Sequence, residues 1–283
     1  MHIADLPPDA ALIERLVTLM DGPSDERLVC FRARCEHAIK SVDIDRPTLA
    51  LVLRGQKHVQ CGNQADQFEP GDLLAVAPGV RLDVVNRPDP ADGRYFSLSI
   101  PLCDEVLGAA RLLWTTPLAS ARMDFVRIPA GSLCTELTAL ADAAEADDEL
   151  RARMAVLALL TQLVPRGCGD LLLPPAPRLS AQVRELVAQA PDRPWQSRDF
   201  EQALGCSGAT LRRRLADEGL SLRELIAQAR LAHALLLLQT TRWPVKSVAA
   251  KVGYCSADSF SRRFRERYGL DASAMGNALP EAA

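Results

Sequence analysis

Two arginine-rich segments in the last third of the chain carry side chains suited to binding another molecule. Residues 207–219 read SGATLRRRLADEG and residues 256–269 read SADSFSRRFRERYG, and their aligned positions lie 49 residues apart. In the first segment Leu211 and Leu215 are four apart, so a helix would bury them on one stripe. The arginines would then project from the opposite face, where a guanidinium can bind phosphate or form paired hydrogen bonds to guanine.

Each segment follows a short helix-forming stretch and a tight turn that contains a glycine, Gly205 or Gly253. Short helix, turn and second helix form the helix-turn-helix pattern, which this chain therefore shows twice. Apolar residues three and four apart predict one long helix over residues 221–239, between the two copies. If that helix holds the copies roughly 34 Å apart, one chain can read two successive major grooves. An exposed arginine face is often merely solvated, but its duplication favours DNA binding.

The residues around the second copy resemble the signature of AraC-type transcription regulators, from Arg230-Leu231 and Ala234 through Val252-Gly253-Tyr254 to Gly269. The resemblance extends from Leu179 onward and implies two helix-turn-helix units joined by one helix. The base contacts that it implies are Ala209, Arg212, Arg213, Ala257, Ser261 and Arg262. We expect phosphate contacts from Ser207, Arg214, Ser256, Arg263 and Arg265. We expect Asp258, unusual beside DNA, to cap its own helix.

The chain departs from the family pattern after Gly269, where it has Asp271, Ala272, Met275 and Gly276. A family regulator commonly has serine or threonine, then proline, and later an aromatic residue with arginine in this stretch. Because of this departure, the resemblance does not imply the family's final short helix, or a phosphate contact from that helix, for this chain.

The proline-rich stretch LLLPPAP predicts a stiff linker over residues 171–177. It separates an expected sensory and dimerisation domain, residues 1–170, from an expected DNA-binding domain, residues 178–276. The net charge of the whole chain is −3. Residues 178–283 hold 16 Lys and Arg against 11 Asp and Glu, a net +5, which leaves −8 for residues 1–177. The near-neutral net charge is therefore the sum of a basic second half, whose charge favours DNA binding, and an acidic first half, whose charge disfavours it.

The first half predicts an antiparallel β-barrel or sandwich followed by helices, with a cupin-like barrel as the expected form, so the expected fold class is α+β. Short apolar runs alternate with turn residues between positions 47 and 101, and helical spacing follows over residues 104–114 and 133–164. Leu150, Met154, Leu157, Leu160 and Val164 would share one face of the latter. These helices either form a dimerisation surface or simply cover the sheet. Candidates for the barrel interior are Leu49, Leu51, Leu53, Leu74, Val76, Phe96, Leu98 and Ile100.

Residues 69–79, EPGDLLAVAPG, resemble the turn and strand of a cupin-type barrel. Enzymatic cupins hold a metal through two histidines at i and i+2 with further Glu and His ligands. Only His58 lies in the strand region here, so no metal, cofactor or catalytic activity is expected.

The eight cysteines include no C-x-x-C pair, and we expect free thiols in a cytoplasmic protein that does not engage a membrane. Three classes of effector remain open: an anion, a thiol-modifying signal, or another protein. Anion candidates are Arg54, Lys57, His58, Arg81 and Arg94, and thiol candidates are Cys30, Cys35, Cys61 and Cys103.

The sequence thus predicts a sequence-specific transcription regulator, an activator rather than a repressor. Its expected partners are double-stranded DNA, RNA polymerase, a small-molecule or protein effector, and a second copy bound through the first half. The alternative is a cupin-type enzyme or small-molecule-binding protein with an accessory helical domain.

Overall fold

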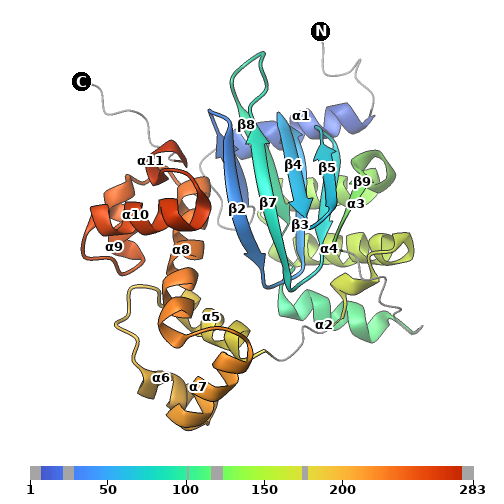
Figure 1. Ribbon diagram of the computed structural model, residues 1–283. Coiled ribbons are helices and arrows are strands. Elements are labelled where there is room, and N and C mark those ends of the chain that lie inside the picture. Colours follow the sequence, from blue (N-terminus) through green and yellow to red (C-terminus); the bar gives the residue numbers. More distant parts are fainter. Residues whose placement is uncertain (1–7, 22–28, 101, 116–123, 174–177, 276–283) are drawn as a thin grey trace. The chain divides into compact units, whose positions relative to one another are not determined.

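The computed structural model describes residues 8–21, 29–100, 102–115, 124–173 and 178–275. The chain divides into two compact units, residues 1–174 and 175–283 (Figure 1). The first unit contains α1 (Pro8–Asp21), β1 (Val29–Ala33), β2 (His37–Ile44), β3 (Thr48–Arg54), β4 (Gln56–Cys61), β5 (Gln64–Phe68), β6 (Asp72–Val76), β7 (Val80–Arg87), β8 (Tyr95–Ile100), α2 (Asp104–Leu113), β9 (Phe125–Pro129), η2 (Ala130–Leu133), α3 (Cys134–Glu145), α4 (Glu149–Leu163), η3 (Val164–Arg166) and η4 (Gly169–Leu171).

The strands form two antiparallel sheets, in the orders β1-β8-β3-β6-β9 and β2-β7-β4-β5. Strands β3 and β4 follow each other in the chain but belong to different sheets, and Gly55 makes the turn between them with φ +74°. A Cβ atom at Gly55 would lie 2.3 Å from the carbonyl oxygen of Arg87. The chain can therefore cross between the sheets here only with glycine.

The five-stranded sheet is buried on both faces, because the second sheet covers one and helices cover the other. Its helix-facing side chains pack with α1, α2, α3 and α4. In Figure 1, α1 and α4 pass behind the strands and α2 lies below them. The expected interior set was wrong in one respect, since all of it except Leu74 and Val76 faces the helices. Alternation along a strand cannot show this when both of its faces are apolar. The core between the sheets is formed by Ala50, Val52, Val59, Phe68, Leu74, Val76, Leu82, Tyr95 and Phe125, among others.

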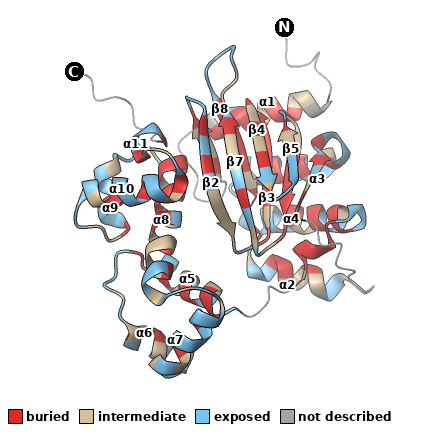
Figure 2. Cartoon of the chain, in the orientation of Figure 1, coloured by how far each residue is buried: buried red, intermediate tan, exposed pale blue. Residues whose placement is uncertain are grey.

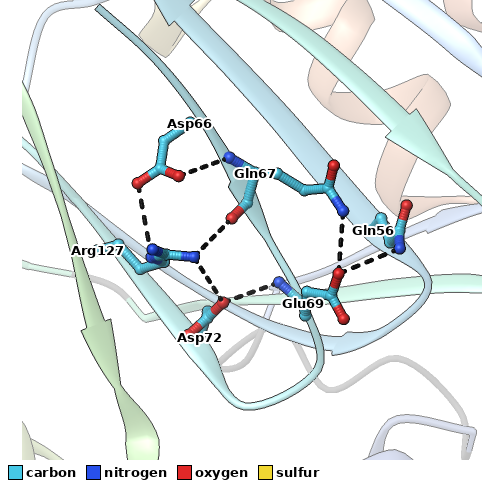
Figure 3. A network of polar contacts seen from close by, with 6 residues as sticks. All are labelled: Gln56, Asp66, Gln67, Glu69, Asp72 and Arg127. Carbon is cyan, nitrogen blue, oxygen red and sulfur yellow. Dashed lines mark hydrogen bonds and ion pairs between the residues drawn. The ribbon is translucent and has the colours of Figure 1, made fainter.

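Of the two expected arrangements, barrel and sandwich, the strands form the sandwich: among the described strands no backbone ladder joins the edge strands β5 and β9. Side chains join the two sheets at this edge instead (Figure 3). Arg127 of β9 donates to the carbonyl oxygen of Gln67 in β5 at 3.1 Å and lies 3.5 Å from the carboxylate of Asp66. Its guanidinium also lies 3.9 Å from Asp72 of β6, whose carboxylate accepts from the backbone N–H of Glu69 at 2.9 Å. The fold is thus a two-sheet sandwich.

The helical spacing over residues 133–164 corresponds to two helices, α3 and α4. Asp147 has φ +56° at the break, and Asp148 caps α4 by accepting from the backbone N–H of Arg151 at 3.0 Å. The predicted stripe, which lies almost entirely within α4, was partly wrong because that helix buries a different face. Leu150 and Met154 are 69% and 61% exposed. The buried side of α4 is made by Ala155, Val156, Leu159, Leu160 and Leu163.

Several elements of the first unit were missed by sequence reasoning, which began the sheet at residue 47. These are α1, the strands β1 and β2, the strand β5 and the edge strand β9. The predicted linker also began too early. Leu171 and Leu172 are buried in the core of the first unit, and the carbonyl of Leu172 accepts from Arg111 Nε at 2.7 Å. Residues 174–177 of that linker lie outside the described residues.

The second unit is helical, with α5 (Leu179–Gln189), α6 (Ser197–Leu204), α7 (Gly208–Asp217), α8 (Leu222–Thr240), α9 (Val245–Lys251), α10 (Ala257–Tyr268) and α11 (Ala272–Met275). The predicted long helix is confirmed as α8. Its first turn is closed by a capping box in which Ser221 and Glu224 each bind the other's backbone N–H. A final short helix, α11, forms despite the departure of this stretch from the family pattern.

All eight cysteines are free thiols. Within the described ranges, no helix is both long and apolar enough to cross a membrane. The same residues contain no group of three or more His, Cys, Asp or Glu side chains that could hold a metal ion.

Candidate nucleic-acid interface

Helix α7, the second helix of the first predicted helix-turn-helix unit, is held by its apolar side. Leu211 and Leu215 are buried in a cluster with Phe200 of α6 and residues of α5 and α8. Arg212 and Arg213 are exposed on the other side of the helix. Figure 2 colours α7 in part as buried and in part as exposed. The leucine spacing therefore positions the two guanidinium groups toward solvent, as the sequence predicted.

Helix α10 has the same construction with aromatic side chains. Phe260, Phe264 and Tyr268 are buried along one side, with successive ring centroids 5.5 and 4.9 Å apart. Such offset aromatic pairs add to the stabilisation from burial. Arg262 and Arg263 are exposed on the other side.

The two helices begin with equivalent caps. Ser207 accepts from the backbone N–H of Thr210 at 3.2 Å, and Ser256 accepts from that of Ser259 at 3.3 Å. Both serines are exposed beside a helix N-terminus, where anions are favoured, and the Ser207 hydroxyl also lies 3.0 Å from that of Thr210. Asp258 lies in the first turn of α10 but does not cap it, since Ser256 does, and that expectation was wrong.

Most of the other predicted contact residues are also accessible. Ala209 and Arg214 are exposed, and Ala257 and Ser261 are half-buried. Arg265 is exposed as well, but its Nε donates to Asp271 at 2.6 Å. Asp271 is one of the residues by which the chain departs from the family pattern, so Arg265 has an intramolecular carboxylate partner that competes with a phosphate.

Four other arginines of α7 and α10 have no carboxylate partner of this kind among the described residues. In the part of the chain that the structure describes, no carboxylate lies within ion-pair distance of Arg212, Arg213, Arg262 or Arg263. Charges that are not neutralised within the protein remain available to an anion outside it.

Sequence reasoning did not single out the loop between α8 and α9. Trp243 is 43% exposed there, between the exposed side chains of Arg242 and Lys246. Indole and cationic side chains together suit a nucleic-acid backbone. The signal that could have found this loop is a tryptophan before proline at a helix start, flanked by basic residues.

The first unit contains a buried polar row across its four-stranded sheet. His37, Asn86 and Lys57 stand opposite one another on β2, β7 and β4. Lys57 Nζ donates to Asn86 Oδ1 at 2.8 Å, and Asn86 Nδ2 lies 3.2 Å from His37 Nε2. Burial lowers the pKa of Lys57 to about 7 and also lowers the pKa of His37. Lys57 also lies over the ring of Tyr95, 5.4 Å from its centroid.

Lys57 is buried, whereas the other anion candidates are half-buried or exposed. Arg54 is paired with Asp92 and Glu14, and Arg81 is paired with Asp43 at 2.7 Å. Arg94 is exposed. His58 is half-buried, and its Nε2 has no hydrogen-bond partner among the described residues.

Comparison with known proteins finds similarity to helix-turn-helix regulators in the helical unit. A helix-turn-helix domain model matches residues 201–277, which include α7, α8, α9 and α10. The urease operon transcriptional activator of Escherichia coli is 31% identical over 91 residues, 32% of this chain and 31% of that protein. The virulence regulon transcriptional activator VirF of Shigella flexneri is 20% identical over 256 residues, 86% of this chain and 88% of that protein.

Solved structures resemble both units together. The apo form of ToxT from Vibrio cholerae gives a TM-score of 0.64 at 14% identity, over 89% of this chain and 97% of that chain. ToxT with an unsaturated fatty acid bound gives 0.63 at 15% identity, over 90% and 97%. This likeness shows a shared α+β fold. The relatives named here are transcription regulators, which favours that function over the alternative of a cupin-type enzyme. With the duplicated helix-turn-helix geometry, they show that the chain is a DNA-binding transcription regulator, whose helical unit resembles the double helix-turn-helix of AraC-type regulators.

Proposed function

We propose that α7 and α10 enter two successive major grooves of one DNA duplex. The observation that carries this proposal is the equivalence of the two helices, each backed by buried residues four apart and each presenting unpaired arginines. Base edges are contacted by Ala209, Arg212, Arg213, Ala257, Ser261 and Arg262. Phosphates are contacted by Ser207, Arg214, Ser256, Arg263 and Arg265, the last after leaving Asp271.

The test uses duplexes that the full chain selects from a random library. Arg213→Ala and Arg262→Ala should each weaken binding by about 1–3 kcal/mol and relax base preference at one position. Arg223→Ala, which removes an exposed arginine from α8, is the matched control. Wild-type affinity should fall steeply with salt because phosphate binding releases counterions. Unchanged binding in both variants would refute the assignment of α7 and α10 as recognition helices.

We infer that the regulator is an activator, as the names of VirF and the urease regulator state for those proteins, and we propose that it acts through contact with RNA polymerase. A reporter joined to the selected DNA upstream of a weak promoter should gain expression when the chain is present. Loss of expression instead would identify a repressor.

We also propose that the first unit binds a small organic acid as effector. The related fold of ToxT binds an unsaturated fatty acid, and Lys57 places a buried amine without a carboxylate partner inside this sandwich. cis-9-Hexadecenoic acid should raise the unfolding temperature of the wild-type chain and leave that of Lys57→Met unchanged. An equal shift in both proteins would exclude Lys57 from the site.

The first unit is further proposed to form a homodimer. Large apolar side chains are exposed on two helices that pack against each other, Leu112 and Leu113 on α2 and Leu150 and Met154 on α4. Exposed apolar side chains of this size often belong to an interface. Leu113→Glu with Met154→Glu should convert a dimer to a monomer in analytical ultracentrifugation, whereas Ala38→Glu, at an exposed position of β2, should not. A monomeric wild type would refute the proposal.

A further inference from the structure

Arg230, in the middle of α8, binds backbone from both helix-turn-helix units at once. Its Nε donates to the carbonyl oxygen of Pro191 at 2.8 Å, and its Nη2 donates to that of Arg193 at 2.8 Å. Both acceptors lie in the loop between α5 and α6, which leads into the first helix-turn-helix unit. Its Nη1 donates to the carbonyl oxygen of Gly253 at 3.3 Å, in the turn of the second helix-turn-helix unit. One guanidinium therefore joins three backbone carbonyls from two segments.

A second contact, independent of these hydrogen bonds, brings the same segments together. A Cβ atom at Gly253 would lie 2.9 Å from the carbonyl oxygen of Pro191 and 3.0 Å from Arg230 Cζ. Gly253 also has φ +80°, which other residues rarely adopt. The turn of the second helix-turn-helix unit thus packs directly against the loop of the first, at a distance that only glycine allows.

The loop end of this junction is fixed to the first helix-turn-helix unit. Arg193 forms an ion pair with Asp199 at 2.8 Å and lies 4.5 Å from the ring centre of Trp195. Trp195 donates through Nε1 to the carbonyl oxygen of Ala190 at 2.8 Å and stacks on Phe200 of α6 with centroids 4.9 Å apart. A displacement of the loop would therefore displace α6 and the helices packed on it.

The turn end is fixed to the second recognition helix. Tyr254 follows Gly253 directly and packs edge-on against Phe260 of α10, with centroids 5.4 Å apart. Phe260 is fully buried. The position of the turn is therefore transmitted to the start of α10, where the expected base-contacting residues lie.

We propose that Arg230 sets the spacing and relative orientation of the two recognition helices, and so determines the half-site spacing that the protein accepts. This inference rests on the proposed entry of α7 and α10 into successive grooves. Helix α8 alone leaves both ends free to rotate about the residues that follow α7 and precede α9. A guanidinium has five donors in one fixed plane and can hold several carbonyls in fixed directions. Arg230 is a positioning residue, since its donors are directed at the protein backbone.

Arg230→Lys is the informative variant because it keeps the charge but replaces a planar fork by a single ammonium. Arg223→Lys, on the exposed side of α8, is the matched control. The probes are duplexes selected by the wild-type full chain, rebuilt with the two half-sites moved apart or together by one to five base pairs. Each added base pair rotates one half-site by about a tenth of a turn relative to the other. Helical circular dichroism confirms that each variant is folded.

Wild-type protein and Arg223→Lys should show one preferred spacing, with affinity about tenfold lower two base pairs away. Arg230→Lys should flatten this profile to less than about threefold while binding a duplex with a single half-site as the wild type does. Gly253→Ala, which forces the same two segments apart, should also flatten it. A wild-type profile in both variants would overturn the role of the junction. If the wild type itself shows no spacing preference, the proposed reading of two grooves fails instead.

Discussion

Replacing Lys57 by methionine should change how the stability of the first unit depends on pH. The Lys57 side chain is buried, and its ammonium has one hydrogen-bond acceptor, Asn86 Oδ1 at 2.8 Å. Burial without a carboxylate partner lowers its pKa to about 7 from an ordinary value of 10.5. Methionine has a similar length and no charge, so it fills the same space without that titration.

The direction follows from the two pKa values. Between pH 10.5 and 7 the unfolded chain binds a proton at Lys57 that the folded chain does not. The free energy of unfolding of the wild type therefore decreases as the pH falls through this range, and the contribution levels off below pH 7. At about 1.4 kcal/mol for each pKa unit, the full change is about 5 kcal/mol.

The variant should lack this change and should lose the bond to Asn86 at every pH. An unpaired buried acceptor costs about 1–3 kcal/mol. Lys57→Met should therefore be more stable than the wild type near pH 7 and less stable near pH 10.5. The crossing of the two stability curves is the signature of a buried amine.

The assay is urea unfolding followed by fluorine NMR of chains labelled with 5-fluorotryptophan. Trp114 lies in the first unit, whereas Trp195 and Trp243 lie in the second, so its resonance reports on the first unit. Lys40→Met, which removes an exposed lysine from β2, is the matched control. A difference between wild type and Lys57→Met that stays constant from pH 7 to 10.5 would refute the argument, since Lys57 would then titrate like a solvated lysine.

Three further perturbations test the second unit. Glu218→Ala should lower the free energy of unfolding of the second unit by about 1–3 kcal/mol, measured by tryptophan fluorescence in urea. The reason is that this carboxylate accepts from the backbone N–H of Leu179 at 2.9 Å and from the hydroxyl of Ser180. A smaller loss than with Glu185→Ala would contradict this role. Gly205→Ala should cost about 1 kcal/mol through backbone strain alone, since φ is +61° and no atom lies within 4 Å of the added Cβ; unchanged stability in urea would exclude the strain. Phe264→Ala should cost about 3–5 kcal/mol, because the ring is fully buried, and a milder loss in thermal circular dichroism would show that the site collapses around the gap.

The helical unit was predictable because its signals are local. Ser207, Ser221 and Ser256 each stand directly before a helix in the chain, and each caps that helix in the structure. Leucine or phenylalanine residues four apart give the buried side of a helix wherever the helix lies. The offset of 49 residues then indicates two copies of one unit without knowledge of their contacts.

The sandwich was predictable only in part. Strands β3, β4, β6, β7 and β8 follow from apolar runs between turn residues. Their division between two sheets, the edge joined by Arg127, and the two buried faces of β3 depend on pairings between residues far apart in the chain. Alternation along one strand contains no information about the partner on either face.

The candidate sites divide in the same way: some of their features follow from residues nearby in the chain, and others depend on residues far away in the chain. The chain order alone placed Arg212 and Arg262 on helices that begin at capped turns, since capping and apolar spacing act within a few residues. Tertiary packing decided that Asp271 takes Arg265, that Lys57 is buried opposite Asn86, and that Arg230 joins two helix-turn-helix units. Burial and hydrogen-bond partners are set by segments 6 to 39 residues away in these cases, and side-chain type alone does not specify which acceptor a cation reaches.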